Sequence, residues 1–576
     1  MAFKFNIVTI ITFITFATTA TLTASHLNEC TWEFNNKTNP IVCNIRTLDT
    51  NSPIDLLQDA DGSSRLEILC DESAMLESQL QRNLFKQLTT LSELMLESCK
   101  LLKLSEHSFD GLSGLKKLTI NTKNTLWGPQ RILEMQPLTM SGLNKLVNLE
   151  ITDSNVRVIP DGFYCPLSSL QVLNLTRNRI RSTENLGFAL PTTVECGGAS
   201  LQELTSLDLS QNEIQQIPEN WAVSKLRRLL HLYLQHNNIS ELNSETLAGL
   251  NSLKTLNLSY NHLETLPDGL FYGSRELREI HLQNNELFQL PRSLFHRLEQ
   301  LLILDLSRNQ LTSHHVDNGT FAGLIRLIIL NLSHNALTRI DTTTFKELYF
   351  LQILDLRNNS IGYIDDNAFE PLYNLHTLNL AENRLHTLSD RLFNGLKVLS
   401  KLTLNNNLIS IVEPKVFINC SDLKELDLSS NQLTDVPEAL NGLTVLKSLD
   451  LGENQIKEFR AGAFRNLNQL TGLRLIDNQI DNITKGMFES LPHLSVLNLA
   501  KNKIISIERG SFDANKEIEA IRMDGNFVSE INGIFSTLSS LVWLNLAGKF
   551  IITILMTMEM LTENSFSFYR KSSRLV

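Results

Sequence analysis

The sequence predicts an α/β solenoid of stacked repeats, shaped like a horseshoe. We expect a parallel β-sheet on its concave face and irregular or short helical segments on its convex face. Three observations lead to this prediction: a recurring Leu pattern, an Asn at a nearly constant spacing, and a Phe at a fixed distance after the Asn. Internal repetition at a period of about 20 to 50 residues is typical of solenoids.

The string LxxLxLxxNxL begins clearly at LQVLNLTRNRI and continues through LTSLDLSQNEI and LKTLNLSYNHL. This pattern is the leucine-rich repeat. Successive Asn residues are separated by 34, 25, 24, 24, 24, 26, 24, 24, 24, 24, 23, 24, 24 and 24 residues. The repeat Asn residues are Asn178, Asn212, Asn237, Asn261, Asn285, Asn309, Asn335, Asn359, Asn383, Asn407, Asn431, Asn454, Asn478, Asn502 and Asn526.

Weaker copies precede these repeats, with Cys99 and Ser154 at the Asn position and a distorted copy ending near Lys123. An Asn side chain both donates and accepts hydrogen bonds, so it can satisfy backbone groups where the chain turns away from a strand. We expect Cys99 to fill that position as a small buried residue with a weak S–H donor.

The two Leu of LxL lie two residues apart, so both point to one side of a short strand. Stacking the repeats then fills an interior that no single repeat could bury. The residue between the two Leu faces outward, and much of this row is acidic or amide, which favours a basic or polar protein partner. The row reads Asp208, Tyr233, Asn257, His281, Asp305, Asn331, Asp355, Asn379, Thr403, Asp427, Asp450 and Arg474.

Four members of this row are our candidates for ligand binding. Tyr233 and His281 are aromatic, and aromatic side chains are frequent hot spots of protein interfaces. Asp305 and Asp355 are the acidic candidates. The alternative is that all four are solvated strand residues without a binding role.

A Phe recurs ten residues after many of the repeat Asn residues. An aromatic ligand site is one interpretation, but a stacked core column on the convex side explains the regular spacing better. Replacing such a Phe by Ala should cost about 3–5 kcal/mol. The column comprises Phe271, Phe295, Phe345, Phe369, Phe393, Phe417, Phe464, Phe488 and Phe512.

Residues 1–24 are typical of a secretory signal peptide, with Lys4 before an uncharged stretch rich in Ile, Phe and Thr. The alternative is a membrane anchor, but the strongly apolar part, residues 5–17, is shorter than the ~20 residues that a span needs. No apolar run of 18 residues follows, so we expect no membrane span. The net charge of −11 disfavours binding to nucleic acid.

Secretion would allow the cysteines to form disulfides. We expect residues 25–88 to form a cap with a first degenerate repeat, closed by a Cys30–Cys43 disulfide, with Cys70 as an alternative to one of these two. An insertion near residues 181–200 carries Cys196, which a disulfide to Cys165 would tie to the solenoid. We expect Cys420 to be buried and unpaired.

Residues 89–548 are predicted to form the solenoid, with about 19 repeats. The tail, residues 549–576, lacks the pattern and is interpreted as a truncation or intron-derived sequence.

No GxSxG, HExxH, P-loop or CxxC motif is present, so we expect neither an enzyme nor a cofactor. The adjacent His314 and His315 are interpreted as part of a solvated loop, and no metal site is expected.

Nine N-x-Ser/Thr sequons mark candidate sites of glycosylation. Three of them, at Asn174, Asn257 and Asn331, lie between the two Leu of LxL, where a glycan would cover part of the concave surface. The nine are Asn36, Asn174, Asn238, Asn257, Asn318, Asn331, Asn358, Asn419 and Asn482.

The segments REIHLQNNELFQLP and LYFLQILDLRNNSIGYIDDNAF resemble the ectodomain of insect Toll receptors, above all the long-ectodomain branch that includes Tollo and eighteen-wheeler. The similarity runs from about Cys30 to Leu546. It implies an extracellular receptor for a Spätzle-type cystine-knot cytokine, or one that pairs with other cell-surface receptors, in innate immunity or development. Homodimerisation is a further implication. Family members continue into a membrane helix and a TIR-type signalling domain, and by this resemblance we expect the sequence to be truncated before both.

Two other functions compete with the receptor. One is a cell-adhesion or matrix solenoid, and the other is a secreted decoy, since the chain as given would be secreted. The decoy is disfavoured because the last repeat would expose Leu541, Leu544 and Leu546 without a cap.

Overall fold

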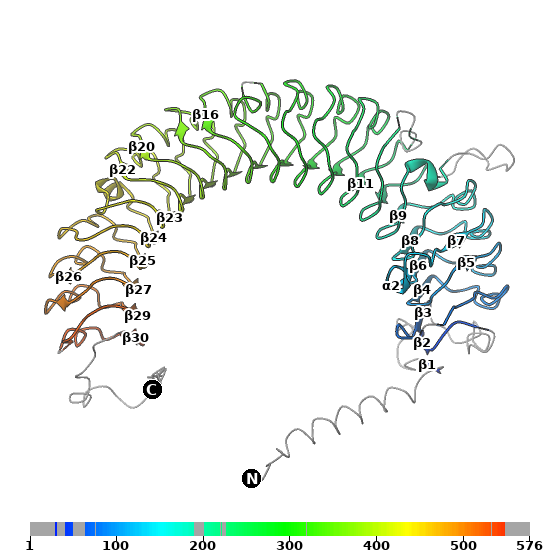
Figure 1. The fold of residues 1–576 in the computed structure, drawn as a ribbon, viewed down its shortest axis with the longest axis horizontal. Helices are drawn as coiled ribbons and strands as arrows, with labels where there is room; N and C mark the ends of the chain where they lie inside the picture. The colour runs from blue at the N-terminus through cyan, green and yellow to red at the C-terminus, as the bar shows by residue number, and fades with distance from the viewer. Residues whose placement is uncertain are drawn as a thin grey trace, which may run out of the picture. The chain divides into compact units, whose positions relative to one another are not determined.

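A computed structural model of the chain describes residues 29–31, 41–49, 64–74, 76–188, 201–218, 221, 226–317, 319–531 and 533–547. The predicted signal peptide, the tail and most of the insertion around Cys196 lie outside the described residues. The chain divides into two compact units, Met1–Glu286 and Leu287–Val576, which we describe separately. In each unit, short strands lie side by side, and irregular segments carry the chain from one strand to the next (Figure 1).

The first unit opens with β1 (Glu29–Thr31), which pairs antiparallel with β2 (Ile41–Ile45). From β2 onward the main strands pair in parallel with the next one along the chain. They are β3 (Arg65–Cys70), β4 (Glu93–Glu97), β6 (Lys117–Asn121), β8 (Asn148–Thr152), β9 (Val172–Asn174), β10 (Ser206–Asp208), β11 (His231–Tyr233), β12 (Thr255–Asn257) and β13 (Glu279–His281).

The second unit continues the same arrangement, with every described main strand parallel to the next. The strands are β14 (Ile303–Asp305), β15 (Ile329–Asn331), β17 (Ile353–Asp355), β19 (Thr377–Asn379), β21 (Lys401–Thr403), β23 (Glu425–Asp427), β24 (Ser448–Asp450), β25 (Gly472–Arg474), β27 (Val496–Asn498), β29 (Ala520–Arg522) and β30 (Trp543–Asn545).

The return segments contain two-residue strands and a few short helices. The strands pair as β5 (Lys103–Leu104) with β7 (Glu134–Met135), β16 (Arg339–Ile340) with β18 (Tyr363–Ile364), β20 (Thr387–Leu388) with β22 (Ile411–Val412), and β26 (Asn482–Ile483) with β28 (Ser506–Ile507). The helices are α2 (Asn124–Trp127), η3 (Thr183–Leu186) and η5 (Glu438–Gly442). The helix α2 follows β6, where the repeat near Lys123 departs from the pattern.

The Leu residues of LxL align across neighbouring strands and form the core. Leu330 on β15 is in register with Leu354 on β17, and both are fully buried. The residues on either side of Leu330 remain partly exposed, as the inward and outward alternation of a strand requires, and the same holds on the other three-residue strands from β9 onward with the exception of the buried Thr255 on β12. We therefore call the first and third residues of the three-residue strands the first-residue row and the third-residue row. Together they form the strand face of each unit.

The repeat Asn closes each turn with bonds to two consecutive repeats. The amide nitrogen of Asn407 donates to the carbonyl of Leu404 in its own repeat, at 3.0 Å, and to that of Leu380 in the preceding repeat, at 2.9 Å. Its Oδ1 accepts the backbone N–H of Leu385 at 3.0 Å. Asn407 is only 5% exposed, so these bonds satisfy groups that water does not reach.

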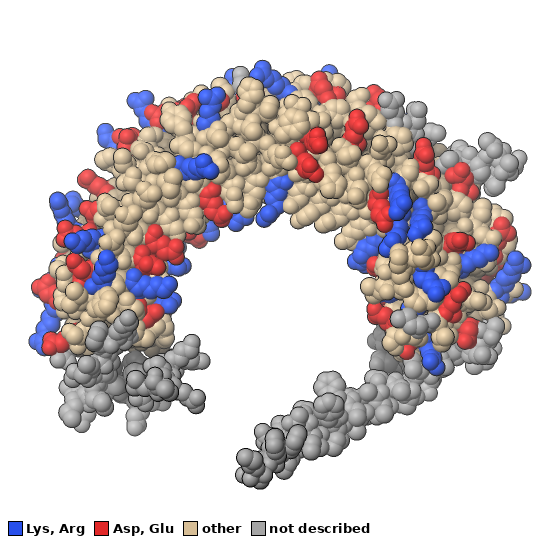
Figure 2. Space-filling model, in the orientation of Figure 1, with Lys and Arg blue, Asp and Glu red and all other residues tan. Residues whose placement is uncertain are grey.

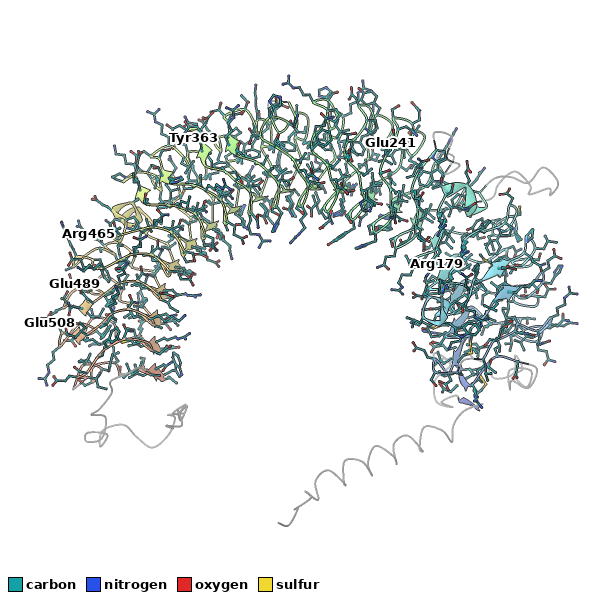
Figure 3. The ribbon with its side chains drawn as sticks, viewed as in Figure 1. Arg179, Glu241, Tyr363, Arg465, Glu489 and Glu508 are labelled. Carbon is teal, nitrogen blue, oxygen red and sulfur yellow. A yellow bond between two sulfur atoms is a disulfide. The ribbon has the colours of Figure 1, made fainter. Side chains whose placement is uncertain are left out.

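The Phe column is buried, and its rings stack in neighbouring repeats. Phe393 is fully buried between Phe369 and Phe417, with ring centroids 6.4 and 5.9 Å apart. Phe488 and Phe512 are stacked in the same way, at 5.7 Å. By contrast, Tyr363 on β18 is 63% exposed, at the margin of the second unit (Figure 3). The column is therefore core, as the regular spacing suggested.

The cysteines differ from our prediction at one pair. Cys30 is bonded to Cys43, the pairing that we expected. However, Cys99 is not a free thiol in an Asn position, and Cys70 does not substitute for Cys30 or Cys43, because Cys70 and Cys99 form a disulfide. Cys70 ends β3 and Cys99 follows the adjacent β4, which places their Cα atoms 4.9 Å apart, within the range for a disulfide.

Two further cysteines lie in the solenoid. Cys165 is disulfide-bonded, and its expected partner Cys196 lies outside the described residues. Cys420 is a buried free thiol, and burial raises its pKa to about 12.

We predict that Phe393→Ala lowers the free energy of unfolding by about 3–5 kcal/mol, because it empties the middle of a stacked column. Calorimetric or denaturant unfolding of the purified chain measures this change. Tyr363→Ala is the control and should stay within about 0.5 kcal/mol of the parent, since the ring is largely exposed. Equal losses in both variants would contradict a core role for the column.

The Asn positions allow a second test, because Asn405, Asn406 and Asn407 are consecutive. Asn407→Ala leaves several buried backbone groups unpaired, each at a cost of about 1–3 kcal/mol, so it should lower the melting temperature markedly. Asn405→Ala, in the same turn, should have little effect. Hydrogen exchange at the Leu385 amide should accelerate only in the Asn407 variant.

Candidate protein-binding face

The third-residue row is held by the turn that follows it. In the second unit, an Oδ1 atom of Asp305 accepts the backbone N–H of Ser307 at 2.9 Å, and one of Asp355 accepts that of Arg357 at 2.9 Å. Asn331, between them in register, makes the same bond to Ser333 at 3.1 Å. The acidic and amide character of this row therefore serves the backbone first, because each of these side chains already uses one oxygen as an acceptor for its own turn.

Burial also affects the charge of this row. Burial raises the pKa of Asp208, Asp355 and Asp450. The hydrogen bonds from the turn lower the pKa of these carboxyl groups, but burial has the larger effect. Folding therefore disfavours the ionised form of these carboxylates. An amide at the same position keeps the bond to the backbone without this cost, as Asn331 and Asn379 do.

Our two aromatic candidates lie in the first unit. Tyr233 on β11 is half-buried, and its ring stacks on that of His231 with centroids 6.3 Å apart. Burial raises the pKa of Tyr233, and the carboxylates of Asp208 and Glu279 raise it further, so its hydroxyl stays protonated at neutral pH. His281 on β13 lies 3.9 Å from Glu279. Between the two candidates, in register, lies the sequon residue Asn257.

The sequence analysis missed a second aromatic pair near Tyr233. The rings of His236 and Tyr260 stack with centroids 4.1 Å apart, and the Tyr260 side chain is 45% exposed. Each of the two residues directly precedes a repeat Asn, in two consecutive repeats. Aligning the repeats at this turn position would have revealed the pair, whereas we considered only the residue between the two Leu.

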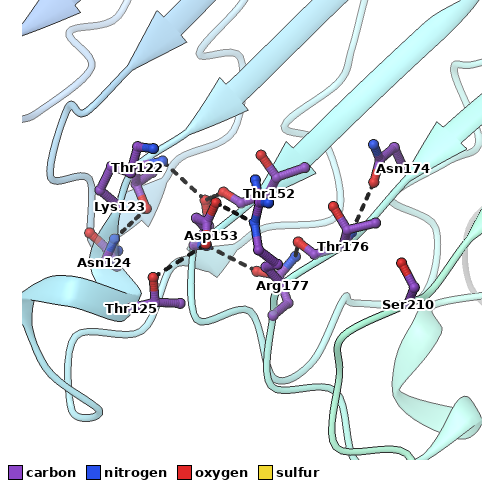
Figure 4. Close-up of polar contacts among 12 residues, drawn as sticks. Thr122, Lys123, Asn124, Thr125, Thr152, Asp153, Asn174, Thr176, Arg177 and Ser210 are labelled. Atoms are coloured by element: carbon purple, nitrogen blue, oxygen red, sulfur yellow. Dashed lines mark hydrogen bonds and ion pairs between the residues drawn. The ribbon is translucent and has the colours of Figure 1, made fainter. Parts of the chain in front are cut away.

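Ion pairs link consecutive repeats, both in the turns beside the strand face and on the face itself. Arg177 bonds to Asp153 at 2.7 Å, and Thr125 donates to the same carboxylate at 3.4 Å (Figure 4). In the second unit, Arg474 pairs with Asp450 at 3.1 Å. On the side drawn in Figure 2, basic and acidic side chains are interspersed over the coloured residues. Arg177 and Arg474 are therefore each paired with a carboxylate of the preceding repeat.

The sequons lie in different settings. Asn238, Asn358 and Asn482 are exposed, whereas Asn174, Asn257 and Asn331 on the strand face are half-buried. Asn419 is also half-buried and donates to Asn394 at 2.7 Å. Asn36 and Asn318 lie outside the described residues.

His314 and His315 contact each other edge to face, with ring centroids 5.0 Å apart. His314 is exposed, and a ring nitrogen of His315 lies 3.2 Å from the hydroxyl of Thr312. In the described part of the chain, no group of three His, Cys, Asp or Glu side chains could hold a metal ion. Within the same residues, no helix combines the length and apolarity needed to cross a bilayer.

We predict that Asp355→Asn stabilises the protein at pH 7. The folded-state pKa of Asp355 lies above its unfolded value, so the parent loses stability as pH rises through this range, and Asn avoids that loss. The difference in melting temperature should shrink below about pH 4, where the unfolded carboxyl is protonated too. The substitution creates no sequon, unlike Asp208→Asn, which would give Asn-Leu-Ser. A destabilised variant at pH 7 would contradict the argument.

Comparison with known families covers most of the solenoid. The Leucine rich repeat family matches residues 202–263, 275–337, 313–361, 325–384, 373–433 and 469–528. A two-copy Leucine Rich repeats family matches residues 421–465, and the BspA type Leucine rich repeat region matches residues 78–190. The predicted repeat pattern is therefore confirmed.

Among curated proteins, the chain is 66% identical over 528 residues to Toll-like receptor 7 of Drosophila melanogaster. The aligned part covers 91% of this chain but 36% of that receptor, so the chain spans about a third of the length of this relative. A more distant relative is Keratocan of Gallus gallus, 29% identical over 168 residues.

Among solved structures, the chain resembles Toll from Drosophila in the Toll–Spatzle complex, with a TM-score of 0.70 and 20% identity over 88% of this chain and 69% of that one. It also resembles TLR13 in its complex with ssRNA13, with a TM-score of 0.53 and 21% identity over 91% of this chain and 90% of that one. At these identities the likeness shows the fold. With the sequence similarity above, it follows that the chain belongs to the leucine-rich repeat family and is related to the Toll-like receptors.

Proposed function

We propose that this chain is the extracellular, ligand-binding part of a Toll-like cell-surface receptor. Its ligand would be a protein, either a Spätzle-type cystine-knot cytokine or a partner receptor, in innate immune or developmental signalling. The observation that carries the proposal is the 66% identity to Toll-like receptor 7, which extends over nearly the whole chain. The similarity to Toll in its complex with Spatzle supports a protein ligand of this class.

The strand face supports binding in place of catalysis. Its outward residues lie in regular rows above Leu residues that are fully buried, so they can vary without disturbing the core. The rows contain aromatic, amide and charged side chains, which are suited to a protein surface. Tyr233 and the stacked His231 form an aromatic cluster on this face in the first unit, and aromatic anchors dominate the free energy of many protein interfaces.

A direct binding measurement tests the proposal. The secreted chain is immobilised, and Spätzle-type cytokines from the same organism are passed over it in surface plasmon resonance. Binding by at least one cytokine, at neutral pH and physiological salt, is the expected result. Self-association in sedimentation velocity without binding to any cytokine would favour the adhesion alternative instead.

We predict that Tyr233→Ala weakens cytokine binding about tenfold or more, because it removes the stacked aromatic side chain from the strand face. Thr403→Ala, in the same third-residue row but in the second unit, is the matched control and should bind like the parent. Circular dichroism checks that both variants remain folded. Unchanged affinity of the Tyr233 variant would remove this cluster from the interface.

A further inference from the structure

Three isoleucines adjoin one another on the strand face of the second unit. Ile303, Ile329 and Ile353 are the first residues of β14, β15 and β17, and they are in register. Ile353 is 39% exposed, and the other two are half-buried. The next members of this row, Thr377 and Lys401, are polar. Adjacent apolar side chains on a surface mark interaction sites more often than apolar side chains that are scattered singly.

A row of basic side chains lies in the turns after the same three strands. It consists of Arg308, His334 and Arg357, and we call it the basic row. The turns are stacked, because the N–H of Arg308 donates to the carbonyl of Ser333 at 2.9 Å and that of His334 donates to the carbonyl of Arg357 at 2.8 Å. Nη2 of Arg357 donates to Nε2 of His334 at 3.4 Å. Burial and the two guanidinium groups lower the pKa of His334, so the imidazole is neutral at pH 7.

The two arginines of the basic row differ from Arg177, which lies in the turn of another repeat, and from Arg474 on the strand face. Arg177 and Arg474 pair with Asp153 and Asp450. Among the residues that the structure describes, neither Arg308 nor Arg357 forms an ion pair with a carboxylate. The Nε atom of Arg357 is buried and has no hydrogen-bond partner there.

The nearest carboxylates on the same strands are already engaged. Asp305 and Asp355 each use an oxygen to accept a backbone N–H of the turn. Among the described residues, these two carboxylates form no ion pair with Arg308 or Arg357, so both guanidinium groups keep N–H donors that no described carboxylate accepts. A guanidinium group offers several N–H donors in a planar fork that matches a carboxylate.

We propose that an acidic segment of a protein partner docks across β14, β15 and β17. A carboxylate of the partner binds Arg308 and Arg357, and apolar side chains beside it cover the isoleucine row. The inference rests on the proposed function and specifies it: the ligand presents acidic and apolar side chains here, whereas the composition of the third-residue row alone had favoured a basic partner.

Asn331 lies in register between Asp305 and Asp355, on the same strand as Ile329. A glycan on this residue would fill the space between the isoleucine row and the basic row. The proposal therefore requires Asn331 to be unmodified in the secreted protein, and intact glycopeptide mass spectrometry measures its occupancy. High occupancy would overturn the proposal.

The charge test uses the full secreted chain and a Spätzle-type cytokine that binds it. Arg308→Glu with Arg357→Glu should weaken binding at least tenfold, and Ile329→Thr should weaken it severalfold. Lys501→Glu is the matched control, since Lys501 is exposed, precedes a repeat Asn and has the same left-handed φ of 53° as Arg308. Equal binding by the parent and the double variant would overturn the proposal and leave the receptor function standing.

Synthetic probes separate this inference from the proposed function. A fluorescent peptide of alternating Leu and Glu should bind the parent more tightly than the Leu and Gln peptide, and the double variant should lose this preference in fluorescence anisotropy. This result would support the acidic-partner site even if no cytokine bound the parent. The double variant could instead lose binding to heparin while it binds each of the two peptides with the same affinity as the parent does. The basic row would then be a site for sulfated polysaccharide, and the proposal would be wrong.

Discussion

The fold depends on one constraint: a short repeat cannot bury its own Leu residues, and it leaves backbone groups unpaired wherever it turns. Neighbouring repeats solve the first problem, and the repeat Asn solves the second by bonding to its own repeat and to the preceding one. Asn407 shows both connections, through the carbonyls of Leu404 and Leu380. The spacing of the repeat is therefore fixed by hydrogen bonds as well as by packing. Each repeat is stable only in the presence of its neighbours.

This constraint explains why so much of the fold was predictable from the sequence. Leu and Phe positions that face the core recur with the period of the repeat, so their burial follows from the pattern alone. The Phe393 column and the Leu330–Leu354 register are examples. The Cys70–Cys99 disulfide was not predictable in this way, because it depends on which ends of two adjacent strands approach each other. We had treated Cys99 as a variant of Asn, and position in the repeat gave no sign of a covalent partner.

The candidate binding face was harder to predict, since its chemistry depends on which polar side chains are already engaged. From the sequence, Asp305 and Asp355 appeared as free acidic groups in an outward row. In the structure, each accepts a hydrogen bond from its own turn. Conversely, Arg308 and Arg357 occupy turn positions to which the repeat pattern assigns no role. They differ from Arg177 because, among the described residues, they form no ion pair with a carboxylate. Residue type therefore indicated polarity, and the hydrogen-bond geometry determined its availability.

The buried thiol of Cys420 has a consequence for the chemistry of secretion. A thiol reacts with disulfides through its thiolate, and burial raises the pKa of Cys420 to about 12, so its thiolate is disfavoured at neutral pH. A buried thiol held in its protonated form is a poor nucleophile toward disulfides and is slow to oxidise. An unpaired cysteine can thus persist in an oxidising compartment without disulfide exchange, because the solenoid interior keeps it protonated and inaccessible.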